Sequence, residues 1–464
     1  MRLWPHTTPA SPNRKIFRAA MIVGSFTLLA KAGATIKELL VARTFGRSDA
    51  LDAFLIAYLL PSFALGLVMG AFGSALIPAL MKTRQKQGAE AAQKLFSGMM
   101  LLSVLALTAL AALLGFLAPY YLPYLGSGFS EAKLRLTRDL LYVLLPFVFF
   151  SGFAGCASAA LNSAENFALP ALAPLLTTLA TVLWIGFGPR NWGPFLLAGG
   201  VVAGSALEAA MLARALQAHG MHLRWQWTGL SPDMRSALGQ CAPMLAGAFL
   251  MSSTSVVDQS MAAMLPAGSV AALNYANRIV AVIIAIGATA LGTAAFPYLS
   301  KMAAQNDWDG CRHTLKRYSL LVFSTTVPFT LCLIAFSKPL VRLLFQRGAF
   351  TSTDTQLVSW TQIAYSIQVP FYIWASLFVR FLSSIRRNDV LMYASGINLV
   401  LDVALNLVLM RRWGVAGLAL STSLVYVFSF LFLTTWSLRL LDQRRLRTAE
   451  TAEDETLAHT ETVG

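Results

Sequence analysis

The sequence has few charged residues for its length, and this shortage excludes an ordinary soluble protein. Only 12% of its 464 residues are charged, whereas 56% are hydrophobic. Soluble globular domains carry about 25% charged residues, so much of the apolar surface here must face lipid. Apolar runs of about 20 residues recur along nearly the whole chain, and each is long enough to cross a bilayer. We therefore predict an all-α polytopic membrane protein with about twelve transmembrane helices.

Cysteine and histidine are also scarce, and their scatter argues against a metal centre. The four cysteines form no CxxC pair, and the five histidines lie in polar connections or tails. His219 and His222 form an HxxH pair, but no third ligand lies near them in the sequence. Neither a disulfide framework nor a zinc site is expected. The net charge of +15 is better explained by Lys and Arg held on the cytoplasmic side of a membrane than by nucleic-acid binding.

The Lys and Arg residues are distributed unevenly between alternate connections. Roughly twice as many lie in the connections on the side of the N-terminus as on the opposite side. This bias predicts a multi-pass protein of the bacterial inner membrane with both termini in the cytoplasm. The first apolar run, from Ala19, has no small-residue cleavage site and contains Lys31, so we expect a retained span. The expected partners include membrane lipids, and a monomer is compatible with the sequence.

The chain contains an internal repeat, which predicts its domains. The segment Arg190–Gly193 (RNWG) matches Arg411–Gly414 (RRWG) at equivalent places among the apolar runs. Because an even number of spans separates the copies, we predict a parallel repeat of two six-helix lobes. The expected parts are a cytoplasmic N-terminal segment (1–18), the two lobes (19–216 and 236–437), a cytoplasmic linker between them (217–235) and a disordered cytoplasmic tail (438–464).

Several ionisable residues lie inside the predicted spans, where each costs about 2.5–3.5 kcal/mol on insertion scales. Lys31, Lys37 and Glu38 lie in the first span, Asp52 opens the second and Arg278 lies in the eighth. Glu38 follows Lys37 directly, so its side chain is expected to face elsewhere. A cationic cleft formed by these residues would attract phosphate or carboxylate. The alternative is a set of buried ion pairs, such as Lys37 with Asp52, that only hold helices together.

Oxygen-bearing side chains recur in the second lobe. Asn398 and Asp402 are four residues apart on one predicted helix, so they share a face. Asp258, in the seventh span, and the hydroxyl of Thr422 are able to complete an oxygen cage around a monovalent cation. We therefore predict sodium, or a proton in its place, as a coupling ion. The alternative is hydrogen bonding between helices, which Asn, Asp and Thr commonly supply in membranes.

Four motifs carry a resemblance to a known family. They are VARTFGRSDALDAFLIAYLLPSF (41–63), GSVAALNYANRI (268–279), ALGTAAFPYLSK (290–301) and LFQRGAFTSTD (344–354). Together they resemble the MurJ (MviN) lipid II flippase family, which shares a superfamily with MATE exporters and Wzx-type polysaccharide flippases. The resemblance covers about residues 16–437. It implies two six-helix lobes in a MATE-like V and a flippase for an undecaprenyl-pyrophosphate-linked glycan, working from cytoplasm to periplasm by alternating access.

The resemblance also implies roles for single residues. The cavity cations and acids of the family correspond here to Lys31, Lys37, Glu38, Asp52 and Arg278. Its sodium site corresponds to Asp258, Asn398, Asp402 and Thr422. The chain departs from the family in carrying Lys at positions 31 and 37, where Arg is typical, and Asn277 where an Asp precedes the arginine. Lysine keeps the positive charge but lacks the bidentate fork of arginine.

These departures leave a second substrate open, namely another lipid-linked oligosaccharide of the exopolysaccharide or O-antigen type. A MATE-like exporter of organic cations fits less well, because its cleft would need acidic rather than basic residues. A polytopic glycan-processing enzyme also fits less well. Such enzymes need a large periplasmic loop with catalytic residues, whereas the longest outward loop (119–137) offers one Glu. We therefore predict a transporter and not an enzyme.

Overall fold

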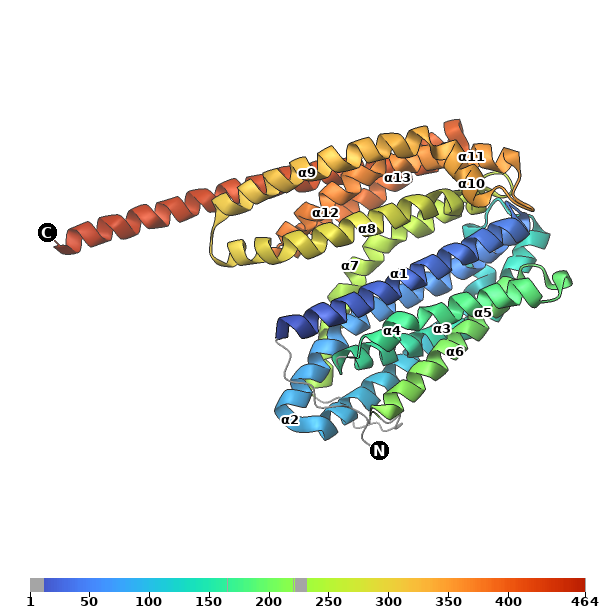
Figure 1. The fold of residues 1–464 in the computed structure, drawn as a ribbon, viewed down its shortest axis with the longest axis horizontal. Helices are drawn as coiled ribbons and strands as arrows, with labels where there is room; N and C mark the ends of the chain where they lie inside the picture. The colour runs from blue at the N-terminus through green and yellow to red at the C-terminus, as the bar shows by residue number, and fades with distance from the viewer. Residues whose placement is uncertain (1–11, 165, 220, 222–231, 464) are drawn as a thin grey trace. The chain divides into compact units, whose positions relative to one another are not determined.

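The computed structural model is all-helical over the residues it describes, which are 12–164, 166–219, 221 and 232–463 (Figure 1). The first half contains α1 (Pro12–Phe45), α2 (Asp49–Leu125), α3 (Glu131–Ser163), α4 (Ala168–Leu172), α5 (Pro174–Phe187), the short 3-10 helix η1 (Arg190–Trp192), α6 (Phe195–Ala218) and α7 (Pro232–Ala262). The second half contains α8 (Ser269–Ala304), α9 (Trp308–Ala335), α10 (Ser337–Phe345), α11 (Ser352–Ser366), α12 (Gln368–Ser384) and α13 (Asn388–Val463). The predicted all-α class is confirmed.

Eight stretches of the described residues are long and apolar enough to cross a bilayer. One of them, Asn388–Leu446, has 59 residues. A continuous helix of that length would measure roughly 90 Å, about three times the hydrocarbon thickness. It therefore holds more than one crossing, and Gly414, with a non-helical φ of 54°, divides it. Gly88, with a φ of 87°, divides α2 in the same way. The polytopic class is confirmed, whereas the count of about twelve helices stays a prediction.

Large apolar side chains lie exposed along these helices. Phe116 on α2 is 76% exposed, Phe187 at the end of α5 is 86% exposed and Val400 on α13 is 71% exposed. In water such surfaces would favour aggregation or association. In a bilayer, lipid tails cover them, while each helix satisfies its own backbone hydrogen bonds.

The backbone repeats at the two RxWG motifs. Gly193 has φ and ψ of 51° and −128°. Gly414 has φ and ψ of 54° and −130°. Both angles lie in a region that favours glycine, because a side chain there would clash with the backbone. Two unusual and nearly identical conformations at matched positions support the predicted internal repeat.

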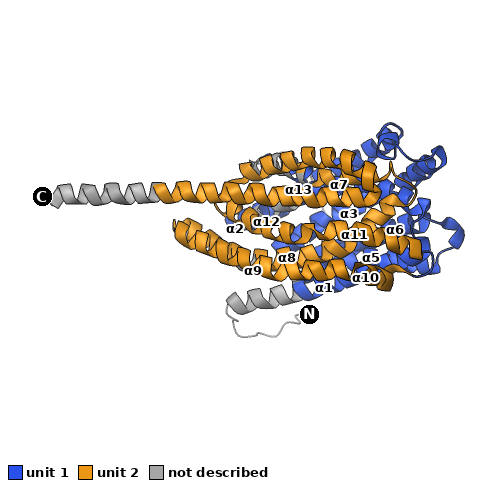
Figure 2. Cartoon of the chain, turned by 90° about the horizontal axis from the view of Figure 1, so that it is seen from above, with its two compact units in different colours: residues 1–249, 347–350 blue, residues 250–346, 351–464 orange. Residues whose placement is uncertain are grey.

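The first compact unit comprises residues 1–249 and 347–350, and Figure 2 distinguishes it by colour. Within it, α2 packs against α3, α3 against α6, and α5 against α6. Small residues permit the closest approach: a Cβ added to Gly204 on α6 would lie 2.4 Å from Cα of Thr177 on α5. The loop at 347–350 belongs to this unit, and the backbone N–H of Ala349 donates to the carbonyl O of Arg43 at 2.9 Å.

The second unit comprises residues 250–346 and 351–464. Its centre is α12, which packs against α8, α9 and α13. Aromatic rings fill part of the contact between α12 and α13: the centroids of Trp374 and Phe430 are 4.3 Å apart, and Phe371 and Phe378 also contact Phe430. This packing fixes α8, α12 and α13 against one another, and these helices carry most of the polar groups described below.

Two expected boundaries differ from the structure. The units divide inside α7, between Phe249 and Leu250, and not in the 217–235 linker, of which residues 220 and 222–231 lie outside the described residues. The ring of Phe249 packs on Phe63 of α2, 5.7 Å between centroids, and this contact ties the first part of α7 to unit 1. The expectation of a disordered tail from residue 438 is also wrong for 438–446, which continue α13. There Arg445 pairs with Asp309 on α9 at 2.6 Å.

Candidate functional site

A cluster of oxygen-bearing side chains lies inside unit 2. Asp258 comes from α7, and Asp402 and Asn406 come from the first part of α13. Thr422 comes from the part of α13 that follows Gly414. Asn398, Asp402 and Asn406 succeed one another at intervals of four residues, so the helix places all three on one face. Asp258 is 6% exposed, and Asp402 and Asn406 are fully buried. We call these five residues the oxygen cluster.

The hydrogen bonds of the oxygen cluster converge on Asp258. Nδ2 of Asn406 donates to Oδ1 of Asp258 at 2.7 Å and approaches Oδ2 of Asp402 at 3.4 Å. The hydroxyl of Thr422 donates to Oδ2 of Asp258 at 3.1 Å. Nδ2 of Asn398 is turned away from the carboxylates and donates to Oγ of Ser429 at 3.2 Å. One amide therefore bridges two buried carboxylates.

Three buried oxygens of the cluster accept no hydrogen bond. They are Oδ1 of Asp402, Oδ1 of Asn406 and Oδ1 of Asn398. A buried acceptor without a donor costs about 1–3 kcal/mol, and a buried carboxylate costs more unless a positive charge meets it. A hard cation that prefers oxygen ligands would satisfy the free oxygen of Asp402. One ion does not reach both Asn398 and Asn406, which lie eight residues, or about 12 Å, apart along the helix. The donor set therefore fits the predicted cation, and Asn406 is a member that the sequence analysis did not name.

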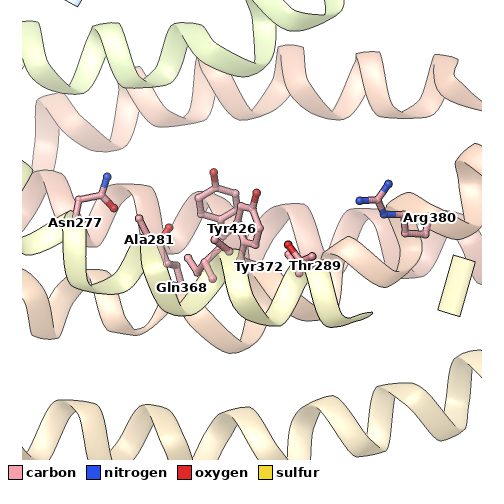
Figure 3. A pocket seen from close by; sticks show the side chains of 10 residues that line it. Asn277, Ala281, Thr289, Gln368, Tyr372, Arg380 and Tyr426 are labelled. Atoms are coloured by element: carbon pink, nitrogen blue, oxygen red, sulfur yellow. The ribbon is translucent and has the colours of Figure 1, made fainter. Parts of the chain in front are cut away.

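A cavity of about 140 Å³ adjoins the oxygen cluster, with Asp258 and Thr422 in its wall. A second cavity, of about 390 Å³, lies along α8, α12 and α13 (Figure 3). Three side chains line both cavities, namely Asn277, Gln368 and Tyr426. The two spaces are thus neighbours inside unit 2, with polar side chains between them.

The predicted cations lie in both units. Lys31 on α1 is exposed, and it has no ion-pair partner among the residues that the structure describes. Arg278 on α8 is exposed and follows Asn277, which lines both cavities. Nζ of Lys37 lies 3.3 Å from Oε1 of Glu38, so the expectation that Glu38 faces elsewhere is wrong. The long, flexible lysine side chain reaches its neighbour around the helix.

Asp52 lies in an ion pair that the sequence did not reveal. It is 1% exposed, and Nζ of Lys133 on α3 lies 3.0 Å from its Oδ2. Lys133 also pairs with Asp49 and lies 3.9 Å from the ring centroid of Phe129. The suggested pairing of Asp52 with Lys37 is therefore replaced by pairing with Lys133, which joins α2 to α3. The proposed role of Asp52 in substrate binding stays a prediction.

Removing the partner of Asp52 is expected to destabilise unit 1. Lys133→Ala would remove the ammonium that lies 3.0 Å from this buried carboxylate, and breaking a buried ion pair typically costs about 3 kcal/mol or more. Thermal unfolding of the purified protein in detergent measures the change. Lys94→Ala is the matched control, because the Lys94–Glu90 pair is 54% and 85% exposed and such surface pairs contribute about 0–1 kcal/mol. Equal melting temperatures for the two variants would contradict this account of Asp52.

The fold and the site together define a class of protein. Apolar helices form two compact units, exposed cations occur in both, and one unit holds a buried oxygen cluster beside cavities with polar side chains. Buried ionisable groups in such helices are typical of ion and substrate pathways, so the class is a polytopic membrane transporter.

The comparisons with known proteins give the family. The profile of the family described as "Lipid II flippase MurJ" matches residues 41–457, and the chain belongs to this family. A probable lipid II flippase MurJ of Synechocystis sp. is 25% identical over 438 residues, covering 90% of this chain and 80% of that protein. The lipid II flippase MurJ of Burkholderia cenocepacia is 28% identical over 364 residues, covering 76% and 70%. The resemblance seen in the four motifs is thereby confirmed.

Solved structures agree on the fold. A lipid II flippase MurJ in an inward closed conformation superposes with a TM-score of 0.75 at 24% identity, covering 89% of this chain and 86% of that one. An inward-facing MATE-family multidrug transporter gives 0.71 at 12% identity, covering 92% and 99%. These likenesses confirm a MATE-type fold. The family match and the apolar helices support a multi-pass protein of the bacterial inner membrane. The relatives are named as flippases, which supports the expected transporter over the enzyme.

Proposed function

We propose that this protein moves an undecaprenyl-pyrophosphate-linked glycan, with lipid II as the first candidate, from the cytoplasmic to the periplasmic leaflet. The family match over residues 41–457 carries the proposal. Chemistry supports it, because a pyrophosphate must cross about 30 Å of hydrocarbon and countercharges along the path lower that barrier. Lys31 and Arg278 supply such charges from the two units.

Alternating access is the mechanism that the fold favours. Structures of the same fold have been solved in inward-facing and outward-facing conformations, the outward-facing MATE transporter with a TM-score of 0.58. The direction of transport is proposed from the family resemblance. The surplus of Lys and Arg on the side of the termini favours a cytoplasmic location for both termini. Either sodium or a proton at the oxygen cluster is proposed as the coupling ion.

A second candidate substrate is a different lipid-linked oligosaccharide. Its support is the replacement of arginine by Lys31 and Lys37, because a lysine binds phosphate as a point charge without a bidentate fork. Such a site would rely more on contacts with the sugars. Both candidates share the pyrophosphate lipid and differ in the headgroup.

Proteoliposomes containing the full chain test the proposal and separate the two substrates. We expect the chain to expose fluorescent lipid II on the opposite leaflet at least tenfold faster than protein-free vesicles. Undecaprenyl-pyrophosphate carrying a peptide-free oligosaccharide serves as the second substrate, and phosphatidylcholine as the negative control. Movement of the oligosaccharide alone would replace lipid II by the second candidate. A folded protein that moves neither pyrophosphate lipid would refute the proposed function.

A further inference from the structure

The sequence alone suggests that Arg380 is an ordinary cation of a connecting loop. In the structure, its side chain lies beside a cavity instead. It is on α12, within the last turns of the helix, and its side chain lines the 390 Å³ cavity of unit 2. Its guanidinium lies against Gly292 of α8: a Cβ added at that glycine would come within 3.2 Å of Nη2 and 3.3 Å of Nε. The absence of a side chain at Gly292 therefore leaves the space that the guanidinium fills.

No carboxylate neutralises Arg380 among the residues that the structure describes. Other arginines of the same unit do have acidic partners: Arg312 pairs with Asp442, Arg387 with Asp389 and Arg445 with Asp309. A guanidinium carries five N–H donors in a planar fork and stays charged at any physiological pH. Arg380 thus offers a full positive charge and unused donors to whatever enters the cavity.

The rest of the cavity wall combines five polar side chains with four apolar residues of α8, and none of these residues is acidic. Along the cavity, Asn277 lies at one end and Arg380 at the other, with Gln368, the two tyrosines Tyr426 and Tyr372, and then Thr289 between them (Figure 3). Amides and phenols bind sugar hydroxyls and leave an anion at the arginine unopposed. A volume of about 390 Å³ falls in the range of about 300–1,000 Å³ typical of small-molecule sites.

We propose that Arg380 forms a phosphate-binding subsite, and that the polar cavity beside it receives the first sugars attached to that phosphate. This inference rests on the proposed function, which supplies a lipid-linked pyrophosphate glycan. A membrane phospholipid has the same phosphate chemistry. Its headgroup, however, would leave the row from Thr289 to Asn277 without a ligand, whereas a glycan would fill it.

The test measures lipid binding to the purified full chain in phosphatidylcholine nanodiscs. The probes are lipid II, undecaprenyl pyrophosphate without sugar, and phosphatidylglycerol. Arg380→Ala is expected to weaken binding of both pyrophosphate lipids by about tenfold or more, since hydrogen bonds to charged groups are the strong ones. Arg380→Lys should recover part of the affinity. Gly292→Val keeps the charge but displaces the guanidinium, and it should weaken binding in the same direction.

Arg317→Ala is the matched control, because Arg317 is an exposed arginine of α9 with no partner among the described residues and does not line the cavity. It should change no affinity by more than about twofold. If Arg380→Ala, folded by its melting temperature, binds lipid II like wild type, the subsite is refuted. If only phosphatidylglycerol binding falls, the subsite belongs to membrane lipid and its assignment to the substrate is overturned. If wild type binds undecaprenyl pyrophosphate through Arg380 but not lipid II, the subsite stands and lipid II as the substrate fails.

Discussion

Cells that depend on Lys31→Ala or Arg278→Ala are expected to lose transport of the lipid-linked glycan, although the variants still insert and accumulate. Lys31 is exposed on α1 and Arg278 is exposed on α8, so neither side chain is packed in a buried core. Fixed positive charges along a path through the membrane attract an anionic substrate, and a pyrophosphate is an anion of this kind. Loss of either countercharge should reduce transport to the background.

The conservative variants separate charge from geometry. Lys31→Arg keeps the charge and gains a fork, so much of the activity should remain. Arg278→Lys keeps the charge but loses the bidentate contact, so its activity should fall further than that of Lys31→Arg. The measurement is exposure of the lipid-linked glycan in the periplasm of cells depleted of their own flippase. Lys316→Ala, an exposed lysine of α9, is the control and should transport normally.

A different result would point to a structural role. Alanine variants that accumulate and transport at the wild-type rate would exclude Lys31 and Arg278 from the path of the substrate. Variants that fail to accumulate would show that the two side chains support folding. The purified variants would then also melt at lower temperatures than the wild-type protein.

The fold class was predictable because lipid selects for apolar runs that the sequence displays directly. The internal repeat was predictable for a different reason: the conformation at Gly193 and Gly414 is one that few residues tolerate, so the sequence there stays recognisable in both copies. The division between the units was not predictable from polarity, because it falls at Phe249, in the middle of a continuous helix.

The contacts between distant side chains were harder to predict than the helices that carry them. Asn398 and Asp402 were paired from their spacing, and the structure adds Asn406 one interval further along the same face. The sequence did contain a signal for Asn406, because it follows Asp402 at the same four-residue spacing that links Asn398 to Asp402. By contrast, nothing local links Lys133 to Asp52, because they are far apart in sequence and meet only when α2 packs on α3.

The oxygen cluster leads to a prediction about ions. Asp258 and Asp402 are two buried carboxylates joined by one amide, and Oδ1 of Asp402 and Oδ1 of that amide accept no hydrogen bond. Two negative charges in an apolar surrounding require a positive charge between them or a proton on one of them. A ligand that binds only the folded protein stabilises it by RT ln(1 + [L]/Kd), about 2.7 kcal/mol at one hundred times Kd. Sodium should therefore raise the melting temperature of the wild-type protein.

Asp402→Asn is expected to abolish both the stabilisation by sodium and the transport that depends on it, since it removes a charged ligand while keeping the shape. Thr422→Val should weaken both, because it removes a hydroxyl that contacts Asp258. Ser423→Ala is the matched control: Ser423 is the next residue and is buried, but its hydroxyl donates to the carbonyl O of Ala364 outside the cluster. Melting temperatures are measured in sodium and in choline at equal ionic strength, and transport is measured with and without a sodium gradient.

A wild-type protein that responds to a pH gradient and not to sodium would identify the ion as a proton. If it responds to neither, the cluster only holds α7 against α13, and Asp402→Asn should then change stability without changing transport.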